Sequence, residues 1–190
     1  MGRIKGRAGR VWLRLHRSER GGTLVEAAII VPLLMLLTFG GIEYGIGFGQ
    51  KGALESATRA GARRAATLTA DPTLAADTLP SVNAALDSTA VPELIRVWIY
   101  RRNGNFDPES GGCAIDCVTF TPTGGDRRHF DAATASGSWP LTSGRDGCSQ
   151  NADRVSVKIL GRFHFLTGLV GSGTIDLRSS STLQFEPTNC

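Results

Sequence analysis

The chain has 190 residues and a formal net charge of +4 at pH 7, a length that suits one domain plus an anchor and excludes two large domains. Residues 1–20 hold seven basic residues and one acid, a net +6, which leaves −2 for residues 21–190. A nucleic-acid-binding domain needs a basic patch on its folded part, so we expect no nucleic-acid partner. The basic run instead resembles a topology signal.

A long apolar run follows this basic leader, which we place at residues 1–21. Residues 27–42 carry no charge. Extended over about residues 24–48, the run approaches the ~20 residues that cross ~30 Å of hydrocarbon. Because the basic residues precede it, we expect a single-pass span with a cytoplasmic N-terminus and an extracytoplasmic C-terminal part. A secretory signal peptide is the competing interpretation, but no A-x-A-like cleavage site follows the run.

Residues 22–70 are predicted to form one long helix that is transmembrane in its first half. Thr23 and Glu26 have the spacing of a capping box at its start. Pro32 removes a helical hydrogen bond and predicts a kink. Pro72 disfavours helical geometry at the preceding residue and ends the helix.

Glu43 lies near the outer edge of the predicted span. Two alternatives remain open for it. It is either solvated among the lipid headgroups, or it contacts a partner, which is Lys51 or another subunit.

Small residues recur four apart along the same helix. They are Gly41, Gly45, Gly49, Ala53, Ala57, Gly61 and Ala65. Small residues at this spacing let helix backbones approach closely. From Ala53 onward we expect packing on the chain's own sheet. For Gly41, Gly45 and Gly49, contact with another helix is at least as good an explanation.

Residues 71–190 are predicted to form an extracytoplasmic sheet domain. One small helix is expected at 73–88, and alternating apolar residues predict strands within 93–102, 153–166 and 173–187. In the first strand Ile95, Val97 and Ile99 share one face, and in the second a bulge is expected near Gly161. The fold class is therefore α+β, with a small antiparallel sheet packed on the outer half of the long helix.

The four cysteines lie in this exported part. Cys113, Cys117 and Cys148 fall in the polar segment 103–153, and Cys190 ends the chain. An even count in an oxidising compartment favours two disulfides, with three possible connectivities. Two alternatives remain. One is a four-cysteine zinc site, although no second paired motif accompanies the C-x3-C spacing, and the other is free or partly paired thiols.

No catalytic or cofactor-binding motif is apparent. His16, His129 and His164 are scattered, and the "DRRHFD" segment at 126–131 has the mixed charge of a solvated surface. No phosphate-binding loop, metal dyad or nucleophile motif occurs. We therefore expect no enzyme activity, no metal and no cofactor.

The anchor resembles that of TadE-like proteins of the tight-adherence pilus system, a branch of the type IV pilin-like subunits. The residues that carry the resemblance are Arg20, Gly21, Leu24, Val25, Glu26, Ala28 and Pro32, followed by "GGIEYG" at 40–45 and "RAGARRAA" at 59–66. It covers about 45 residues. The rest of the chain resembles the family only in arrangement.

The resemblance implies a minor pilin or pseudopilin of a Tad-type (Flp) pilus or related secretion machine. A prepilin peptidase would cut between Gly21 and Gly22, which makes Glu26 the fifth residue of the mature chain. Glu26 would then pair with the new amino terminus of a neighbouring subunit. Its other interpretation is a carboxylate that is favourable near the positive end of the helix dipole.

The partners that follow are the membrane, the peptidase, other pilin-like subunits and the pilus assembly platform. The predicted assembly surface also includes Pro32, Gly41, Glu43, Gly45 and Gly49. Two rival functions remain: an uncleaved, permanently anchored protein, and a binding module, for example for surface glycan, whose site is the 103–153 segment.

Overall fold

The computed structural model describes residues 19–68, 73–87, 91–102, 106–125, 127–139, 146–148, 152–168 and 173–187. The chain divides into two compact units, Met1–Thr38 and Phe39–Cys190. Leader residues 1–18 lie outside the described part. The predicted α+β class is confirmed, because a long apolar helix precedes a five-stranded antiparallel sheet.

Helix α1 spans Glu19–Thr67 and continues through Pro32. The predicted capping box is wrong, since the helix begins at Glu19 and Thr23 already lies inside it. Extending a helix that already exists adds one hydrogen bond for each residue fixed. Gly21 and Gly22 can therefore be helical despite their low propensity.

Four further elements build the first half of the second unit. Helix α2 spans Leu74–Asp87, close to the predicted 73–88, and β1 spans Glu93–Arg101. The short helix α3 covers Pro108–Gly111, and β2 covers Cys117–Phe120. Asp107 caps α3 by accepting a hydrogen bond from the Glu109 backbone N–H.

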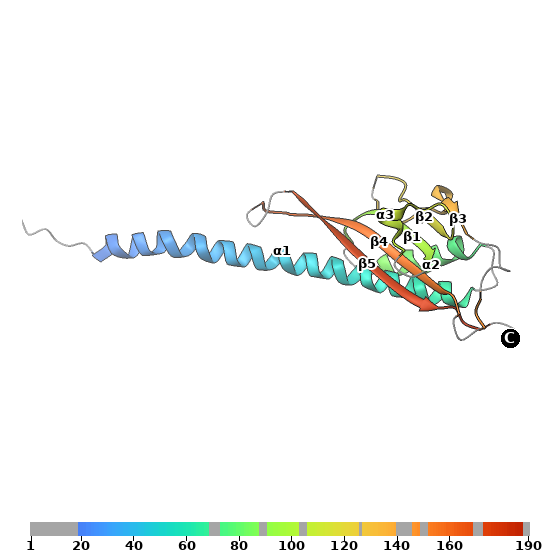
Figure 1. Ribbon diagram of the computed structural model, residues 1–190. Coiled ribbons are helices and arrows are strands. Elements are labelled where there is room, and N and C mark those ends of the chain that lie inside the picture. Colours follow the sequence, from blue (N-terminus) through green and yellow to red (C-terminus); the bar gives the residue numbers. More distant parts are fainter. Residues whose placement is uncertain are drawn as a thin grey trace, which may run out of the picture. The chain divides into compact units, whose positions relative to one another are not determined.

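The remaining elements complete the sheet. A 3₁₀ turn, η1, covers Ala132–Thr134, and β3 covers Ser136–Ser138. The two longest strands are β4, Arg154–His164, and β5, Thr174–Gln184. The strand order is β3-β2-β1-β4-β5, and every pairing is antiparallel (Figure 1). Strands β2 and β3 lie within the segment 103–153, where no strand was predicted.

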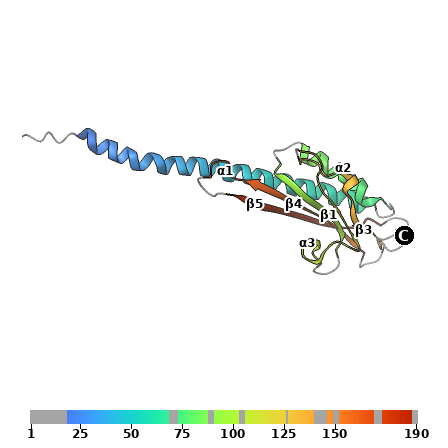
Figure 2. The same ribbon diagram turned by 90° about the horizontal axis from the view of Figure 1, so that it is seen from above.

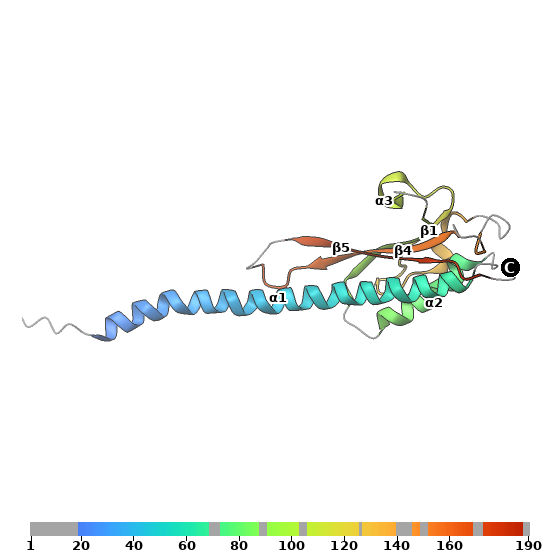
Figure 3. The ribbon, with the colours of Figure 1, turned by 60° about the horizontal axis from the view of Figure 1, so that its bottom comes forward.

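The main core lies between the sheet and two helices. Figure 3 shows α1 and α2 on one side of the sheet and α3 on the other. Leu54 and Ala57 of α1 and Leu79 and Val82 of α2 are buried against the inward residues of β1 and β4. Seen from above, the outer half of α1 runs beside β4 and β5 (Figure 2).

An irregularity lies beside Gly161, as predicted, but the extra residue is in the neighbouring strand β1, where Leu94 pairs with Gly161 and Arg96 with Leu160. Strand β4 pairs with β5 without a break, whereas the β1 register shifts between Leu94 and Arg96. Leu94 consequently takes the fully buried core position, and Ile95 is only partly buried. Gly161 is needed for packing, since a Cβ there would lie 2.7 Å from Pro92 Cγ.

Candidate functional site

The first unit exposes apolar side chains around its helix. Leu24, Ile29 and Leu37 are 71%, 69% and 62% exposed. The helix from Gly21 onward is long and apolar enough to cross a membrane. A helix that is apolar all round needs an apolar environment, so these side chains suit contact with lipid.

The residues predicted for cleavage and assembly lie on this helix. Gly21 and Gly22 are exposed and helical, and a Cβ at either would meet nothing within 4 Å. Glu26 and Pro32 are exposed as well. These positions are accessible from outside the chain, and cleavage after Gly21 would require local unwinding of the helix start.

Glu43 takes a position that the sequence did not indicate. Its side chain is 1% exposed. Its Oε1 accepts a hydrogen bond of 2.6 Å from the Thr167 backbone N–H. Its Oε2 is buried, with no hydrogen-bond partner among the described residues. Lys51, the predicted partner, instead donates to the carbonyl oxygen of Arg178.

The cover over Glu43 is the hairpin formed by β4 and β5. Phe163 and Phe165 contact each other edge to face, with ring centroids 5.3 Å apart. A groove of about 210 Å³ lies between this hairpin and α1. Its lining is mostly apolar and consists of Glu43, Tyr44, Gly47, Phe48, Lys51, Phe163, Phe165, Ile175 and Leu177.

The row of small residues divides into two parts. Ala53, Ala57 and Ala65 are at most 3% exposed and pack within the chain's own domain, as predicted. Gly41, Gly45 and Gly49 are exposed, and a Cβ at each would meet nothing within 4 Å. The first three glycines of the row therefore remain open to an outside partner.

A buried cation holds α3 against the outer face of the sheet. Lys158 Nζ donates to the two carboxylate oxygens of Asp107 at 2.7 and 3.0 Å and lies 2.7 Å from Glu109 Oε2. Arg178 Nε donates to Glu109 Oε1 at 2.9 Å. The Nζ of Lys158 also lies 5.8 Å from the ring centroid of Trp98, a cation–π distance.

These contacts shift three pKa values. The hydrogen bond from Lys158 is the main cause that lowers the pKa of Asp107, and the same holds for Glu109. Burial pulls the pKa of Lys158 down, but its hydrogen bonds to the two carboxylates outweigh burial and raise it above 10.5. All three groups are charged at neutral pH, so the cluster is an ion-paired clamp.

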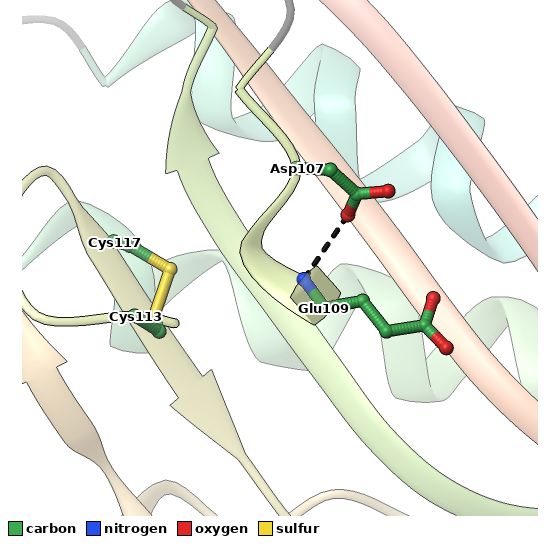
Figure 4. The surroundings of a disulfide bond; sticks show 4 residues. All are labelled: Asp107, Glu109, Cys113 and Cys117. Atoms are coloured by element: carbon green, nitrogen blue, oxygen red, sulfur yellow. Dashed lines mark hydrogen bonds between the residues drawn. A yellow bond between two sulfur atoms is a disulfide. The ribbon is translucent and has the colours of Figure 1, made fainter. Parts of the chain in front are cut away.

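The cysteines support a disulfide framework. Cys113 and Cys117 are bonded to each other, and Cys148 is also disulfide-bonded. Cys190 lies outside the described residues. Figure 4 shows the first bond together with Asp107, whose carboxylate caps α3.

The two histidines in the described part of the chain pair with carboxylates on the surface, and His16 lies outside it. His129 Nε2 lies 2.5 Å from Asp87, and His164 Nε2 lies 2.9 Å from Glu93. The hydrogen bond from His164 is the main cause that lowers the pKa of Glu93. In the described part of the chain, no three His, Cys, Asp or Glu residues gather in a way that could hold a metal ion.

Comparison with known families identifies the anchor. Residues 21–63 match the family described as TadE-like protein. The anchor is TadE-like. The match begins at the predicted cleavage position and ends within the buried half of α1, so it includes Glu26 and Glu43. Neither a curated protein nor a solved structure matches the chain.

Sequence reasoning missed two sets of residues. The hairpin that covers Glu43 contains Phe163, Phe165 and Thr167, and the clamp contains Lys158 with Asp107 and Glu109. One signal for the hairpin was available: no acidic or basic residue lies between His164 and Asp176. The clamp had no local signal, because its cation and its carboxylates lie about fifty residues apart in the chain.

Proposed function

We propose that this chain is a minor pilin or pseudopilin that takes part in assembling a Tad-type (Flp) pilus or a related secretion machine. The observation that carries the proposal is the coincidence of the TadE-like match with a helix whose apolar side chains are exposed. The chain is anchored by this helix with its N-terminus in the cytoplasm, and the sheet domain is extracytoplasmic, in the pilus or at its base.

Maturation is the first step of the proposed function. A prepilin peptidase removes the basic leader by cutting between Gly21 and Gly22. Both residues are helical and exposed, and glycine favours a helix by ~1 kcal/mol less than alanine does. Two adjacent glycines thus lower the free energy needed to unwind this segment into a protease groove.

Assembly then proceeds by lateral helix packing. The open positions Gly41, Gly45 and Gly49 let the backbone of a neighbouring subunit's helix approach closely. Glu26 is exposed one turn after the new amino terminus. It pairs with the amino terminus of the next subunit, which matches two charges that would otherwise face an apolar environment.

The mature N-terminus tests maturation directly. The full chain is extracted from membranes of its host and of a host that lacks the prepilin peptidase, and the N-terminal peptide is identified by mass spectrometry. We expect a chain that begins at Gly22 in the first host and the intact leader in the second. An intact leader in both hosts would identify a permanently anchored protein and overturn the maturation step.

A substitution at Glu26 tests assembly. Glu26→Gln keeps the volume and removes the charge, so the partner's ammonium is left uncompensated, at a cost of ~3–5 kcal/mol for a buried pair. We expect surface pili, counted by electron microscopy, to fall at least about tenfold, since ~1.4 kcal/mol already corresponds to that factor. Glu55→Gln is the matched control, because Glu55 is an acid on the same helix that pairs with Arg59 in its own chain. Equal pilus counts in the two variants would argue against the role of Glu26.

A further inference from the structure

The β4–β5 hairpin buries the carboxylate of Glu43, so that this charge is absent from the exposed surface of the anchor helix. Glu43 is the only charged residue between Glu26 and Lys51 in the sequence. It is 1% exposed, and its carboxylate is held by the Thr167 backbone N–H of the hairpin. The surface that α1 presents from residue 27 to residue 50 is therefore uncharged.

The length of this surface is sufficient for Glu43 to lie at the depth of the hydrocarbon. Twenty-four residues at ~1.5 Å each give about 36 Å, more than enough to cross ~30 Å of hydrocarbon. Glu43 follows Glu26 by seventeen residues, which is about 26 Å along the helix axis. If the span begins just after Glu26, Glu43 lies a few ångströms inside the outer boundary, and the hairpin that covers it lies at the same depth.

The surface around Glu43 has the composition of a membrane interface. Tyr44 and Phe48 on α1 are 57% and 74% exposed. On the hairpin, Leu166 and Ile175 are 69% and 46% exposed. No acidic or basic residue lies between His164 and Asp176. Aromatic residues gather where a span meets the headgroups, and an uncharged, apolar hairpin beside them fits the same layer.

We propose that the described parts of this hairpin around Leu166 and Ile175 insert into the outer boundary of the lipid bilayer. The occupant of the apolar surface is lipid, because this surface adjoins the exposed apolar helix along the chain. The hairpin serves as a collar that keeps a buried carboxylate away from the acyl chains, where a charge is costly. The proposal rests on the membrane anchoring in the proposed function, and it adds a second membrane contact made by the exported domain.

Spin-label accessibility tests the collar. Leu166→Cys, Leu37→Cys and Ile115→Cys are made in the full chain, labelled with a nitroxide without reduction and reconstituted in phosphatidylcholine–phosphatidylglycerol vesicles. The unsubstituted chain is labelled in the same way, as the control for nitroxide that attaches to native cysteines. Collision rates with oxygen, which concentrates in lipid, and with a water-soluble nickel chelate then report the surroundings of each label. Leu166 and Ile115 are matched, since they are 69% and 75% exposed.

We expect the Leu166 label to resemble the Leu37 label in the span, with high oxygen and low nickel collision rates, and the Ile115 label to be water-accessible. A Leu166 label as accessible to nickel as the Ile115 label, with Leu37 in lipid, would overturn the collar and leave the anchor intact. Low collision rates with both reagents, with dipolar broadening between labels, would place a second copy on this surface and also overturn it. A water-accessible Leu37 label would instead refute the membrane anchor.

Discussion

At Gly61, α1 lies close to both α2 and the sheet. A Cβ at this position would lie 2.6 Å from Val82 Cγ2 of α2 and 3.3 Å from Val157 Cγ1 of β4. Both neighbours are β-branched and fully buried, so they have little freedom to move aside. The absence of a side chain at Gly61 therefore sets the distance between α1, α2 and the sheet.

Gly61→Ala should destabilise the exported domain. Overpacking a core costs ~1–3 kcal/mol, and the better helix propensity of alanine returns at most ~1 kcal/mol. We expect a net loss of about 1–2 kcal/mol, or several degrees in the unfolding midpoint at ~2–4 °C per kcal/mol. Thermal unfolding of the full chain in detergent micelles, followed by near-UV circular dichroism, measures it.

Gly52→Ala is the control for this prediction. Gly52 is exposed on the same helix, and a Cβ there meets nothing within 4 Å. The Gly52→Ala substitution should raise the free energy of unfolding by ~0.5–1 kcal/mol, because only the gain in helix propensity remains. The close approach at Gly61 would be disproved if both alanine variants were stabilised.

At the scale of single residues, the sequence predicted the burial of side chains that follow a local pattern. It missed contacts with residues that are distant in the chain. The spacing of Ala53, Ala57 and Ala65 indicated a buried helix face, and these residues are buried. Glu43 was misjudged because its partner is a backbone N–H 124 residues away in the chain. No side-chain pattern around Glu43 records a contact with a backbone group.

At the level of elements, the strands with an alternating apolar pattern were predictable. Val155, Val157 and Ile159 of β4 are fully buried on one face. Strand β3 has the sequence Ser-Gly-Ser, and all three residues are exposed, so it carries no hydrophobic pattern. The short strand β2 lies in a segment rich in glycine, threonine and aspartate, where turns were the better local explanation.

The clamp around Lys158 fixes α3, which is too short to be stable alone. Lys158→Met keeps the apolar stem on Trp98 but removes the cation shared by Asp107 and Glu109. Since Asp107 is about half exposed, water screens part of the loss, and we expect about 1–2 kcal/mol of destabilisation near neutral pH. Arg59→Met, which breaks an exposed helical pair with Glu55, should change stability by less than ~0.5 kcal/mol.

The effect of Lys158→Met should depend on pH. The pKa values of Asp107 and Glu109 are lowered from 3.8 and 4.5 in the folded chain. A lowered carboxyl pKa stabilises the fold above the unfolded value, and this contribution is lost as the pH falls through the folded value. Urea unfolding of the Lys158→Met variant and of the unsubstituted chain is measured at about pH 7 and about pH 2.5. The difference between their free energies of unfolding should be smaller at the lower pH. An equal difference in the free energy of unfolding at the two pH values would show that packing, not ion pairing, holds α3.

For the whole molecule, the exposed apolar residues are concentrated in one place. Of eighteen large exposed hydrophobic residues among the described ones, fourteen lie between Leu24 and Phe48 of α1. Two of the other four, Leu166 and Ile175, lie on the hairpin beside Glu43. The sequence predicted the span because a span is a local run, but the return of the hairpin to α1 is a property of the tertiary fold.

The disulfide framework gives the last prediction for the whole chain. Four cysteines allow three pairings, and only one of these contains the Cys113–Cys117 bond. Cys148 is disulfide-bonded, and we predict that within one chain its partner is Cys190. We expect a non-reducing tryptic digest of the membrane-extracted protein to contain residues 103–127 with an internal bond and peptide 146–154 linked to peptide 179–190. Reduction should separate that pair and raise the mass of the first peptide by about two hydrogens, as expected for cleavage of one disulfide.

A link between peptide 103–127 and either of the other two peptides would contradict this connectivity. A 146–154 peptide linked to its own copy would show that the second bond joins two chains.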